Sequence, residues 1–528
     1  MPEEDKLLRK ISNECAKTSQ VVSEFYHGRW FKMIKRAVNS FQRGGCDKEL
    51  LVLTGPRRVG KTTILFKLHD EFKRNACYIN VEDSDVRRYI TTHSLKDLVI
   101  FLYKNTKRNI FMLDEITSLG QEWSRAVKEL WDYLEKNNLR IFLIITGSAG
   151  ILISNKYSDI AGRSGYCKSG EHTLTNPLVV LPKKFSELLG ELPYKTPSGR
   201  SPIIPLKWRD RISTLIKITG ADRSTIDSVN TTLKITTITQ KQQISLSNYM
   251  RAVFDDFLVR GGFPQLLQAH LSTNNPYDDV HRIATNILDS IHKDATLLNL
   301  KDVETRNFLV AYKNVARMST LIDIVKLENE LKRLLNITNK KSDPNLIPKL
   351  IEFFRGAHIL VEAVPLTIDV DKDPQLNMNL KKLFLIDPSL FWAIYYNDIN
   401  FNNYKSQKNY SMTIIGFLLE HTVCSHLIRL GRDIRLEFYN DGEIDIDCIF
   451  ELQGNKIFLQ VERSGKEVEK DLERTADIIK KIKAQDKNSL KNYYPVSVVY
   501  ELDEIITYDL SNGQTGVAIP AHYFLSLI

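Results

Sequence analysis

Residues Leu53–Leu65 read LTGPRRVGKTTIL, and this stretch decides the fold. Within it, Gly55–Thr62 match G-x-x-x-x-G-K-[ST], the pattern of a loop that wraps a phosphate. The apolar run LLVL before the loop suits a buried parallel strand, and the segment KTTILFKLHDEF after it has apolar residues at helical spacing. We therefore predict a strand, a phosphate-binding loop and a helix in direct succession.

The predicted loop supplies the groups that a nucleotide phosphate needs. Its glycines let backbone amides approach a phosphate at the start of the helix, where the helix dipole also favours an anion. Lys61 would reach the β- and γ-phosphates, and the Thr62 hydroxyl would contact Mg²⁺, so the cofactors predicted are ATP and Mg²⁺. The alternative is a glycine-rich turn without a ligand. The residues that would surround the phosphates are Gly55, Pro56, Arg57, Arg58, Val59, Gly60, Lys61, Thr62 and Thr63.

An acidic pair follows a second apolar run some fifty residues downstream. In RNIFMLDEI, residues 110–113 read as a buried strand, and Asp114 and Glu115 stand at its carboxyl end. Asp114 would hold Mg²⁺ through water, and Glu115 would orient the attacking water as a general base. A hydrophobic run followed by two acids is common by itself. Its position after the phosphate loop is what indicates an ATPase.

Two more apolar runs fit the same sheet. ACYINVED ends in Glu82 and Asp83, which would face the same rim, and RIFLIITGSAG ends in Thr146, Gly147 and Ser148. Ser148 is a candidate for the polar residue that senses the γ-phosphate, and it suits a helix N-cap equally well. Strands alternating with helices predict a right-handed parallel sheet that binds its ligand at the strand carboxyl ends.

These motifs together resemble a known family. LTGPRRVGKTT, YINVED, FMLDEI, LIITGSAG, IAGRSG and FLVRGGFPQLL occur in the order found in the archaeal-type P-loop ATPases, which are close to the STAND and AAA+ classes. The resemblance covers about residues 25–500. It implies that Arg163 reads or stabilises phosphate charge, although an exposed loop arginine would look the same. It also implies that Pro264 packs near the adenine, although GGFP equally suits a tight turn between helices.

The expected fold class is α/β: a P-loop NTPase parallel sheet with a helical lid, a winged helix and a C-terminal α/β nuclease-like domain. The expected domains are an N-terminal helical segment (1–48), the ATPase core (49–180), the lid (181–300), the winged helix (301–368) and the nuclease-like domain (369–528). Residues 194–246 depart from the family as an insertion rich in Thr, Ser and basic residues.

The segment 301–366 is helical by periodicity and is followed by the apolar run AHILVEAVPLTI, which is the element order of a winged helix. Its basic residues could contact DNA phosphates, although charged helix residues are more often simply solvated and acidic residues dilute this group. The basic residues are Lys326, Lys332, Arg333, Lys340, Lys341 and Lys349.

The last part of the chain resembles the PD-(D/E)xK nuclease fold, in which a helix Glu, a strand Asp and an E-x-K strand hold Mg²⁺ and activate water. The matching positions are Glu420, Asp445, Gln460 and Glu462, with Asp447 on the same strand face as Asp445. The motif requires a lysine where this chain has Glu462. Lys456 and Lys466 are candidates to replace it. We expect a nuclease-like fold with lost or altered chemistry.

Composition limits the remaining possibilities. The six cysteines are scattered without a CxxC pair, so neither a zinc site nor a disulfide framework is expected. No run of about 18 apolar residues occurs and the N-terminus is charged, so we expect a cytoplasmic protein without a membrane partner. The net charge of +9 permits a nucleic-acid partner without requiring one.

The function predicted is an ATP-binding, Mg²⁺-dependent ATPase that acts as a nucleotide-driven switch, with ATP and ADP as ligands. Double-stranded DNA, a second copy of the chain and a partner protein are the candidate partners. Two alternatives remain open. One is a DNA-binding or scaffold protein that binds nucleotide tightly with little turnover, and the other is an ATP-gated nuclease.

Overall fold

The computed structural model separates the chain into two compact units, and each is described by itself. The first unit comprises Met1–Pro182, Asp289–Asp302 and Glu352–His358, and the second comprises Lys183–Leu288, Val303–Ile351 and Ile359–Ile528. The structure describes residues 2–15, 28–147, 157–160, 163, 167–169, 172–173, 177–191, 208–238, 243–272, 275–316, 319–337, 343, 345–366, 379–396, 408–430, 434–485 and 492–528.

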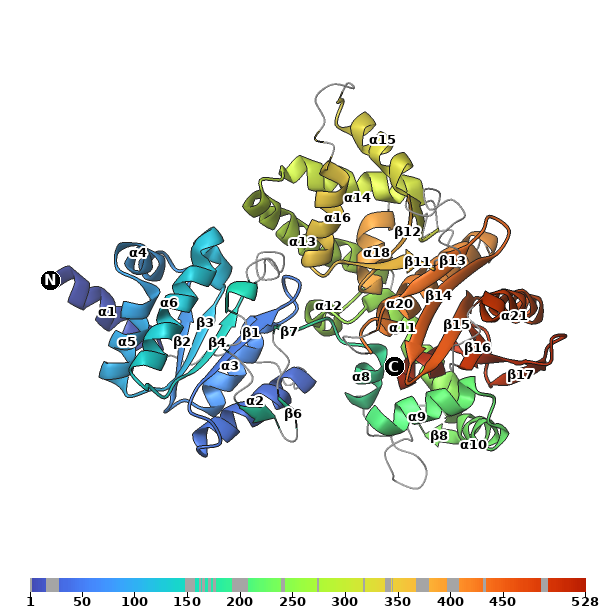
Figure 1. Ribbon diagram of the computed structural model, residues 1–528, viewed down its shortest axis with the longest axis horizontal. Coiled ribbons are helices and arrows are strands. Elements are labelled where there is room, and N and C mark those ends of the chain that lie inside the picture. The colour runs from blue at the N-terminus through green and yellow to red at the C-terminus, as the bar shows by residue number, and fades with distance from the viewer. Residues whose placement is uncertain are drawn as a thin grey trace. The chain divides into compact units, whose positions relative to one another are not determined.

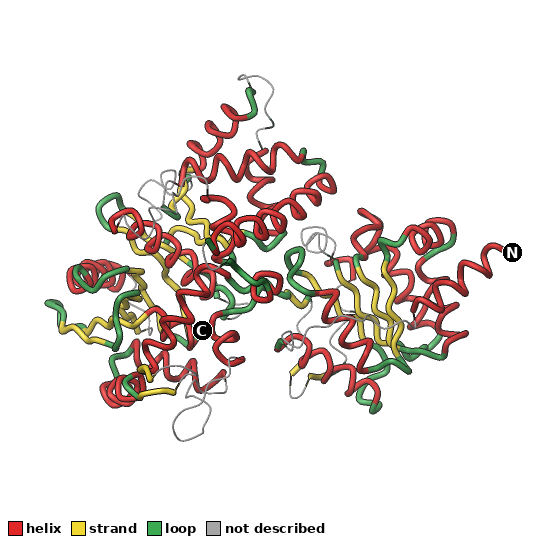
Figure 2. Tube along the Cα trace, turned by 180° about the vertical axis from the view of Figure 1, so that it is seen from behind, coloured by secondary structure: helices red, strands yellow, loops and turns green. Residues whose placement is uncertain are grey.

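The first unit is built on a parallel sheet of five strands (Figures 1 and 2). The strand order is β2-β3-β4-β1-β7, and each neighbouring pair is parallel. The predicted parallel P-loop sheet is therefore confirmed. The strands are β1 (Glu49–Thr54), β2 (Ala76–Asn80), β3 (Ile110–Asp114), β4 (Phe142–Thr146) and β7 (Leu178–Val179).

Helices cover both faces of this sheet, because its strands are apolar on both sides. One face packs on α1 (Pro2–Cys15), α4 (Ser84–Thr92), α5 (Leu95–Thr106) and α6 (Trp123–Lys136), and residues of these helices and of the sheet form one buried apolar cluster. The other face carries α2 (Arg29–Gln42) and α3 (Lys61–Glu71); the Phe41 ring of α2 lies edge-on to Phe142 of β4. The unit also contains η2 (Ile116–Glu122), η3 (Tyr157–Ile160), η4 (Lys293–Leu298) and the short pair β5 (Lys168–Ser169) and β6 (His172–Thr173).

The second unit contains a mixed sheet of nine strands in the order β10-β12-β11-β13-β14-β15-β16-β18-β17. Because β11 pairs in parallel with β13, the sheet continues across residue 368, where the sequence predicted a domain boundary. The regions that the sequence predicted as a winged helix and a nuclease-like domain therefore share one sheet. Its strands are β10 (Leu321–Asp323), β11 (Leu360–Pro365), β12 (Leu380–Leu385), β13 (Glu437–Asn440), β14 (Asp445–Leu452), β15 (Asn455–Glu462), β16 (Asn492–Val499), β17 (Ile506–Asp509) and β18 (Thr515–Pro520).

The remaining helices lie wholly or partly in the second unit; α13 and α16 end, and α14 begins, in residues that group with the first unit. Part of the predicted insertion forms α9, α10 and the hairpin of β8 (Thr236–Ile238) and β9 (Gln243–Ser245), while residues 192–207 lie outside the described residues. The helices are α8 (Phe185–Glu191), α9 (Trp208–Thr219), α10 (Arg223–Leu233), α11 (Leu246–Arg260), α12 (Pro264–Gln268), α13 (Pro276–His292), α14 (Asp302–Ala316), α15 (Ile324–Leu334), α16 (Leu346–Gly356), α18 (Pro388–Tyr395), α20 (Lys408–Leu427), α21 (Val468–Gln485) and α22 (Ala521–Leu527).

The prediction that the cysteines form no disulfide framework is wrong. The structure joins Cys46 to Cys167 and Cys424 to Cys448, and Cys77 is also in a disulfide. The sequence could not reveal these pairs because their partners lie 121 and 24 residues apart and belong to elements that only the fold brings together. Cys424 on α20 and Cys448 on β14 tie that helix to the central strands of the second sheet.

Candidate functional site

The phosphate loop joins β1 to α3 and requires glycine at two points. Gly60 caps α3 in the left-handed region with φ of 97°. At Gly55, whose φ is 141°, a Cβ atom would lie 1.9 Å from the carbonyl oxygen of Val180, so only glycine lets the chain pass. Arg58 is also left-handed, with φ of 63°. The loop is thus a strained turn at the start of a helix, the arrangement in which backbone amides line an anion site.

Lys61 is buried and turned toward its own loop. Its Nζ donates hydrogen bonds to the carbonyl oxygens of Gly55 (2.8 Å) and Pro56 (3.0 Å). Burial lowers the pKa of Lys61, and the nearby charges of Glu115 and Asp114 oppose this shift. Because a phosphate oxygen is a stronger acceptor for an ammonium than a neutral carbonyl, these loop contacts are ones that a phosphate can replace.

Asp114 ends β3 and is held by hydroxyl groups from two neighbouring strands. The Tyr78 hydroxyl donates to its Oδ2 at 2.8 Å, and the Thr146 hydroxyl donates to its Oδ1. From the sequence, Thr146 was expected at this rim and Ser148 was the candidate for sensing the γ-phosphate. Tyr78 was not predicted to be part of the site. Strand register brings all three together, since β2 and β4 flank β3. A fixed carboxylate with hydroxyl oxygens nearby is a donor set that suits Mg²⁺.

Glu115 follows Asp114 in a backbone conformation that turns the chain away from the sheet. Its φ is 55°, and its amide donates to the Thr146 hydroxyl at 3.1 Å. Its negative charge favours the protonated forms of Lys61 and Arg57 and so acts to raise the pKa of each. Burial, together with the charge of Glu115, raises the pKa of Glu82. The residues predicted from separate motifs are therefore neighbours at one edge of the sheet.

Two residues from far along the chain join this site, and sequence reasoning missed both. Asp294 in η4 accepts three hydrogen bonds from the guanidinium of Arg57, at 2.6, 2.9 and 3.0 Å, and these bonds raise the Arg57 pKa. His358, after α16, lies close enough to Lys61 to sense its charge. Burial and that charge lower the His358 pKa to about 4, so its ring is neutral at physiological pH.

Three predicted site residues stay predictions. Ser148 lies outside the described residues. Arg163 pairs with Asp132 (3.0 Å) on α6, one turn before Glu135, whose carboxylate binds Lys48 at the amino end of β1. Its predicted role at the phosphates stays a prediction. Pro264 begins α12 in the second unit, so its predicted contact with an adenine stays a prediction.

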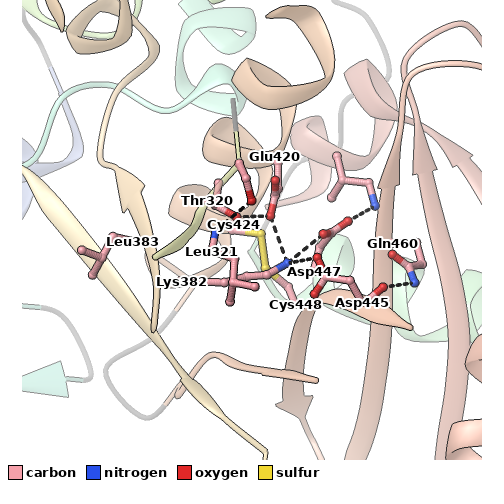
Figure 3. Close-up of polar contacts among 12 residues, drawn as sticks. Thr320, Leu321, Lys382, Leu383, Glu420, Cys424, Asp445, Asp447, Cys448 and Gln460 are labelled. Atoms are coloured by element: carbon pink, nitrogen blue, oxygen red, sulfur yellow. Dashed lines mark hydrogen bonds and ion pairs between the residues drawn. A yellow bond between two sulfur atoms is a disulfide. The ribbon is translucent and has the colours of Figure 1, made fainter. Parts of the chain in front are cut away.

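A second acidic cluster lies in the nine-stranded sheet (Figure 3). Glu420 of α20 and Asp445 and Asp447 of β14 point toward one ammonium group, that of Lys382 on β12. The distances from Lys382 Nζ are 3.2 Å to Glu420, 3.0 Å to Asp445 and 2.9 Å to Asp447. Burial raises the pKa of Glu420 to about 8, and the three carboxylates raise that of Lys382 against the effect of its own burial.

Lys456 and Lys466 were the candidates to replace the missing lysine of the nuclease motif, but the cation of this cluster is Lys382. Lys456 instead binds Glu437 at 2.8 Å. Glu462, at the position where the nuclease motif has its lysine, has a pKa raised to about 8 by burial and by surrounding carboxylates such as Asp447. Lys382 was missed because it lies in an ordinary strand, KKLFL, with no motif around it.

One comparison with known proteins covers the first site. Residues 47–188 match the model of a family described as "AAA domain". No curated protein matches the chain. Solved structures similar to it include Cdc6p from Pyrobaculum aerophilum (13% identity, TM-score 0.25, covering 72% of this chain and 93% of that one) and Drosophila ORC bound to DNA (11%, 0.21, 73% and 91%). A katanin structure also matches (15%, 0.23, 42% and 77%). At such scores these likenesses carry no conclusion about function.

The family match and the loop geometry together support a P-loop ATPase fold for the first unit. In the part of the chain that the structure describes, no helix is long and apolar enough to cross a membrane.

Proposed function

We propose that the chain is an ATP-binding, Mg²⁺-dependent ATPase. One observation carries this proposal: Lys61, Asp114 and Glu115, from two separate motifs, meet at the carboxyl edge of the first sheet. ATP bound there would supply the phosphoryl group that is transferred to water, with Mg²⁺ neutralising charge on its phosphates.

Each residue has a distinct role in this proposal. The loop amides and Lys61 bind the phosphates, and Thr62 and Asp114 are the residues that would hold the metal ion. Glu115 takes the proton of the attacking water as a general base. Thr146 and Tyr78 keep the Asp114 carboxylate oriented through their hydrogen bonds, and Thr146 also fixes the Glu115 backbone.

The proposed biological use is a switch between domain arrangements. The segments 289–302 and 352–358 group with the phosphate-loop unit, whereas the chain on either side of each segment groups with the second unit. Asp294 in the first segment binds Arg57 of the loop, and His358 in the second lies near Lys61. A ligand that moves Arg57 or Lys61 would act on both segments. Proteolysis patterns that are identical with ADP, with an ATP analogue and without nucleotide would argue against this switch.

A winged helix is the proposed identity of the region around α14–β12. The order α14, β10, α15, α16, β11, β12 and the pairing β10-β12-β11 support it. Its contact with DNA is a weaker proposal, because its described basic residues are paired with acids. Lys332 binds Glu328 at 2.6 Å, and Arg333 binds Glu330 at 2.7 Å. Lys340 and Lys341 lie outside the described residues.

A nuclease-like fold is the proposed identity of the region from α20 onward. The order α20, β13, β14, β15, α21, β16, with antiparallel pairs β13-β14 and β14-β15 and the parallel pair β15-β16, supports it. Cleavage of DNA is not proposed, since Glu462 cannot supply the positive charge of the missing lysine.

Steady-state ATP turnover tests the central proposal. Glu115→Gln should retain ATP binding and lose turnover by on the order of 100-fold or more, the usual contribution of a general base. Exposed Glu129→Gln on α6 is the matched control and should behave as the parent. Turnover by Glu115→Gln at the parent rate would require another base. A parent that binds ATP tightly without hydrolysis would favour the scaffold alternative, and a rate raised by double-stranded DNA would support the DNA link.

A further inference from the structure

We propose that the first unit binds double-stranded DNA at the amino edge of its parallel sheet, the edge opposite the phosphate loop. We define the amino edge as the segments 42–48, 72–75, 104–109 and 135–141, which lead into β1, β2, β3 and β4. The proposal depends neither on ATP hydrolysis nor on the proposed winged helix, because these segments lie outside the ATP site and outside residues 301–368.

Backbone hydrogen bonds hold the four segments side by side. The Asn109 amide donates to the Asn75 carbonyl at 3.1 Å, and the Phe142 amide donates to the Asn109 carbonyl at 2.8 Å. The Glu49 amide donates to the Ile141 carbonyl at 3.3 Å. Because neighbouring strands lie about 4.8 Å apart, four of them span about 15 Å, close to the roughly 12 Å width of the DNA major groove. The outer segments are therefore spaced to contact phosphates on the two sides of a groove.

The amino edge is strongly basic. Its four segments hold nine basic residues and two acidic ones, whereas the whole chain has 73 and 64. Six of the nine are exposed, and their side chains make no ion pair or hydrogen bond with any described residue. These six are Arg43, Lys73, Arg74, Lys104, Lys107 and Lys136. Their positive charges are available to an anionic partner.

The other three basic residues are held by the fold. Lys48 binds Glu135 at 3.0 Å, which neutralises one of the two acids of the edge. Arg140 donates to the carbonyl oxygen of Phe41, and its guanidinium lies 4.9 Å from the centroid of the Phe41 ring. Arg108 is partly buried. We therefore assign the DNA contacts to the six exposed residues only.

Helix ends offer a simpler explanation for these cations. The helices α2, α3, α5 and α6 all end at the amino edge, and the carboxyl end of a helix favours lysine and arginine. Each helix end carries about half a negative elementary charge, so four ends offset about two positive charges. Basic residues exceed acidic ones at this edge by more than that. A net positive charge remains after the helix ends are satisfied.

A positive surface without exposed aromatic rings suits the phosphate backbone of a duplex. Proteins that bind single strands stack the bases on aromatic side chains, whereas Phe41, Phe72 and Trp131 near this edge are buried. Lysine and arginine contacts to phosphates position a duplex without reading its sequence, and the binding weakens as salt rises. We therefore expect binding that is independent of sequence and sensitive to salt.

Fluorescence anisotropy with a labelled duplex about two helical turns long tests the proposal on the nucleotide-free full-length protein. Arg74→Gln/Lys107→Gln should weaken binding at least about tenfold and reduce the slope of log K against log salt by about two, because two phosphate contacts are lost. The matched control is Arg87→Gln/Lys128→Gln. It removes the same charge from exposed residues of α4 and α6 that have no ion pair with a described residue, and it should bind as the parent does.

Three results would overturn the proposal: a parent that does not bind the duplex at low salt, an amino-edge variant that binds like the parent, or equal losses in both double variants. Tighter binding of oligothymidine or of phosphatidylserine vesicles than of the duplex would also overturn it, by identifying a single strand or a membrane as the partner.

Both double variants should keep the parent melting temperature and the parent ATP turnover measured without DNA. A parent that binds the duplex at this edge but does not hydrolyse ATP would count against the ATPase proposal alone. The two proposals can therefore fail separately.

Discussion

Two buried lysines, Lys61 and Lys382, each lie among acidic residues at a sheet, yet their environments differ. Lys61 is held by two neutral carbonyl oxygens of its own loop, whereas Lys382 is held by three carboxylates from two other elements. A phosphate oxygen binds an ammonium more strongly than a neutral carbonyl does, so it can replace the acceptors of Lys61. It has no such advantage over the three carboxylates that already bind Lys382. The comparison indicates that the hydrogen-bond acceptors around a buried lysine decide whether it can bind a ligand or only stabilise the fold.

The largest effect should come from substitution of Lys61, whose neutral acceptors a phosphate can replace. Lys61→Ala should reduce kcat/KM for ATP by on the order of 10⁴-fold, because charge contacts to the transferred phosphoryl group are lost. Nucleotide binding should also become too weak to measure. Stability should change little, since the described hydrogen-bond acceptors of Lys61 are neutral carbonyl oxygens. Turnover assays and calorimetry check this, with exposed Lys73→Ala as the control. Tight nucleotide binding by Lys61→Ala would remove the contrast between the two lysines.

Substitution of Lys382 should have the opposite effects, a loss of stability with little change in ATP turnover. Lys382→Met should lower the free energy of unfolding by about 3–5 kcal/mol, because it leaves buried carboxylates without their cation. ATP turnover should stay near the parent value. Denaturant unfolding checks the loss, and Lys332→Met, whose lysine is paired with Glu328 on a helix surface, should cost no more than about 0.5 kcal/mol. Equal losses for both variants would mean that the buried cluster adds nothing special.

A smaller effect should come from Arg57, the phosphate-loop arginine that is bound to Asp294. Asp294→Asn removes a buried negative charge and frees Arg57, so ATP should bind roughly fivefold more tightly, about 1 kcal/mol. Titration with a fluorescent ATP analogue measures this change. Asp47→Asn, at an exposed position before β1, is the control. Weaker binding in Asp294→Asn would mean that the ion pair is needed to shape the loop.

The smallest effect concerns pH and Glu462. Its pKa in the folded chain is raised from 4.5 to about 8 by burial and by Asp447, Asp471, Glu467 and Glu420. The folded state therefore binds more protons than the unfolded state between pH 4.5 and 8, and stability falls as pH rises through this window.

Glu462→Gln removes that pH dependence. Its melting temperature should equal that of the parent near pH 5 and exceed it by about 2–4 °C at pH 8, which corresponds to roughly 1 kcal/mol after allowance for partial exposure. Melting curves across this range measure the difference. A parent and variant that respond to pH alike would show that Glu462 is ionised in the fold.

The sequence was most informative where function depends on neighbouring residues in the chain. Gly55, Gly60 and Lys61 were identified because a phosphate loop is one short segment, and its backbone conformation demands glycine at fixed places. The strands of the first sheet followed from apolar runs of strand length. Asp114 and Glu115 followed because parallel strands bring their carboxyl ends to one edge.

Sequence reasoning failed where partners come from distant segments. Thr146 was noted at the correct strand end, but its hydrogen bond to Asp114 depends on register between strands. The Arg57–Asp294 ion pair was missed for the same reason, because its two residues lie 237 positions apart. The disulfides and the shared nine-stranded sheet were likewise missed, because no local pattern specifies which element lies beside which.

The sequence by itself thus determined the phosphate loop, the parallel sheet that carries it and the acidic pair beside it, because short-range spacing and backbone limits fix them. Only the tertiary structure decided that Asp294 binds Arg57 and that Lys382 fills the carboxylate cluster. These contacts join residues 237 and 65 positions apart. Their strength comes from burial and charge, which act through space and leave no mark on the order of residues along the chain.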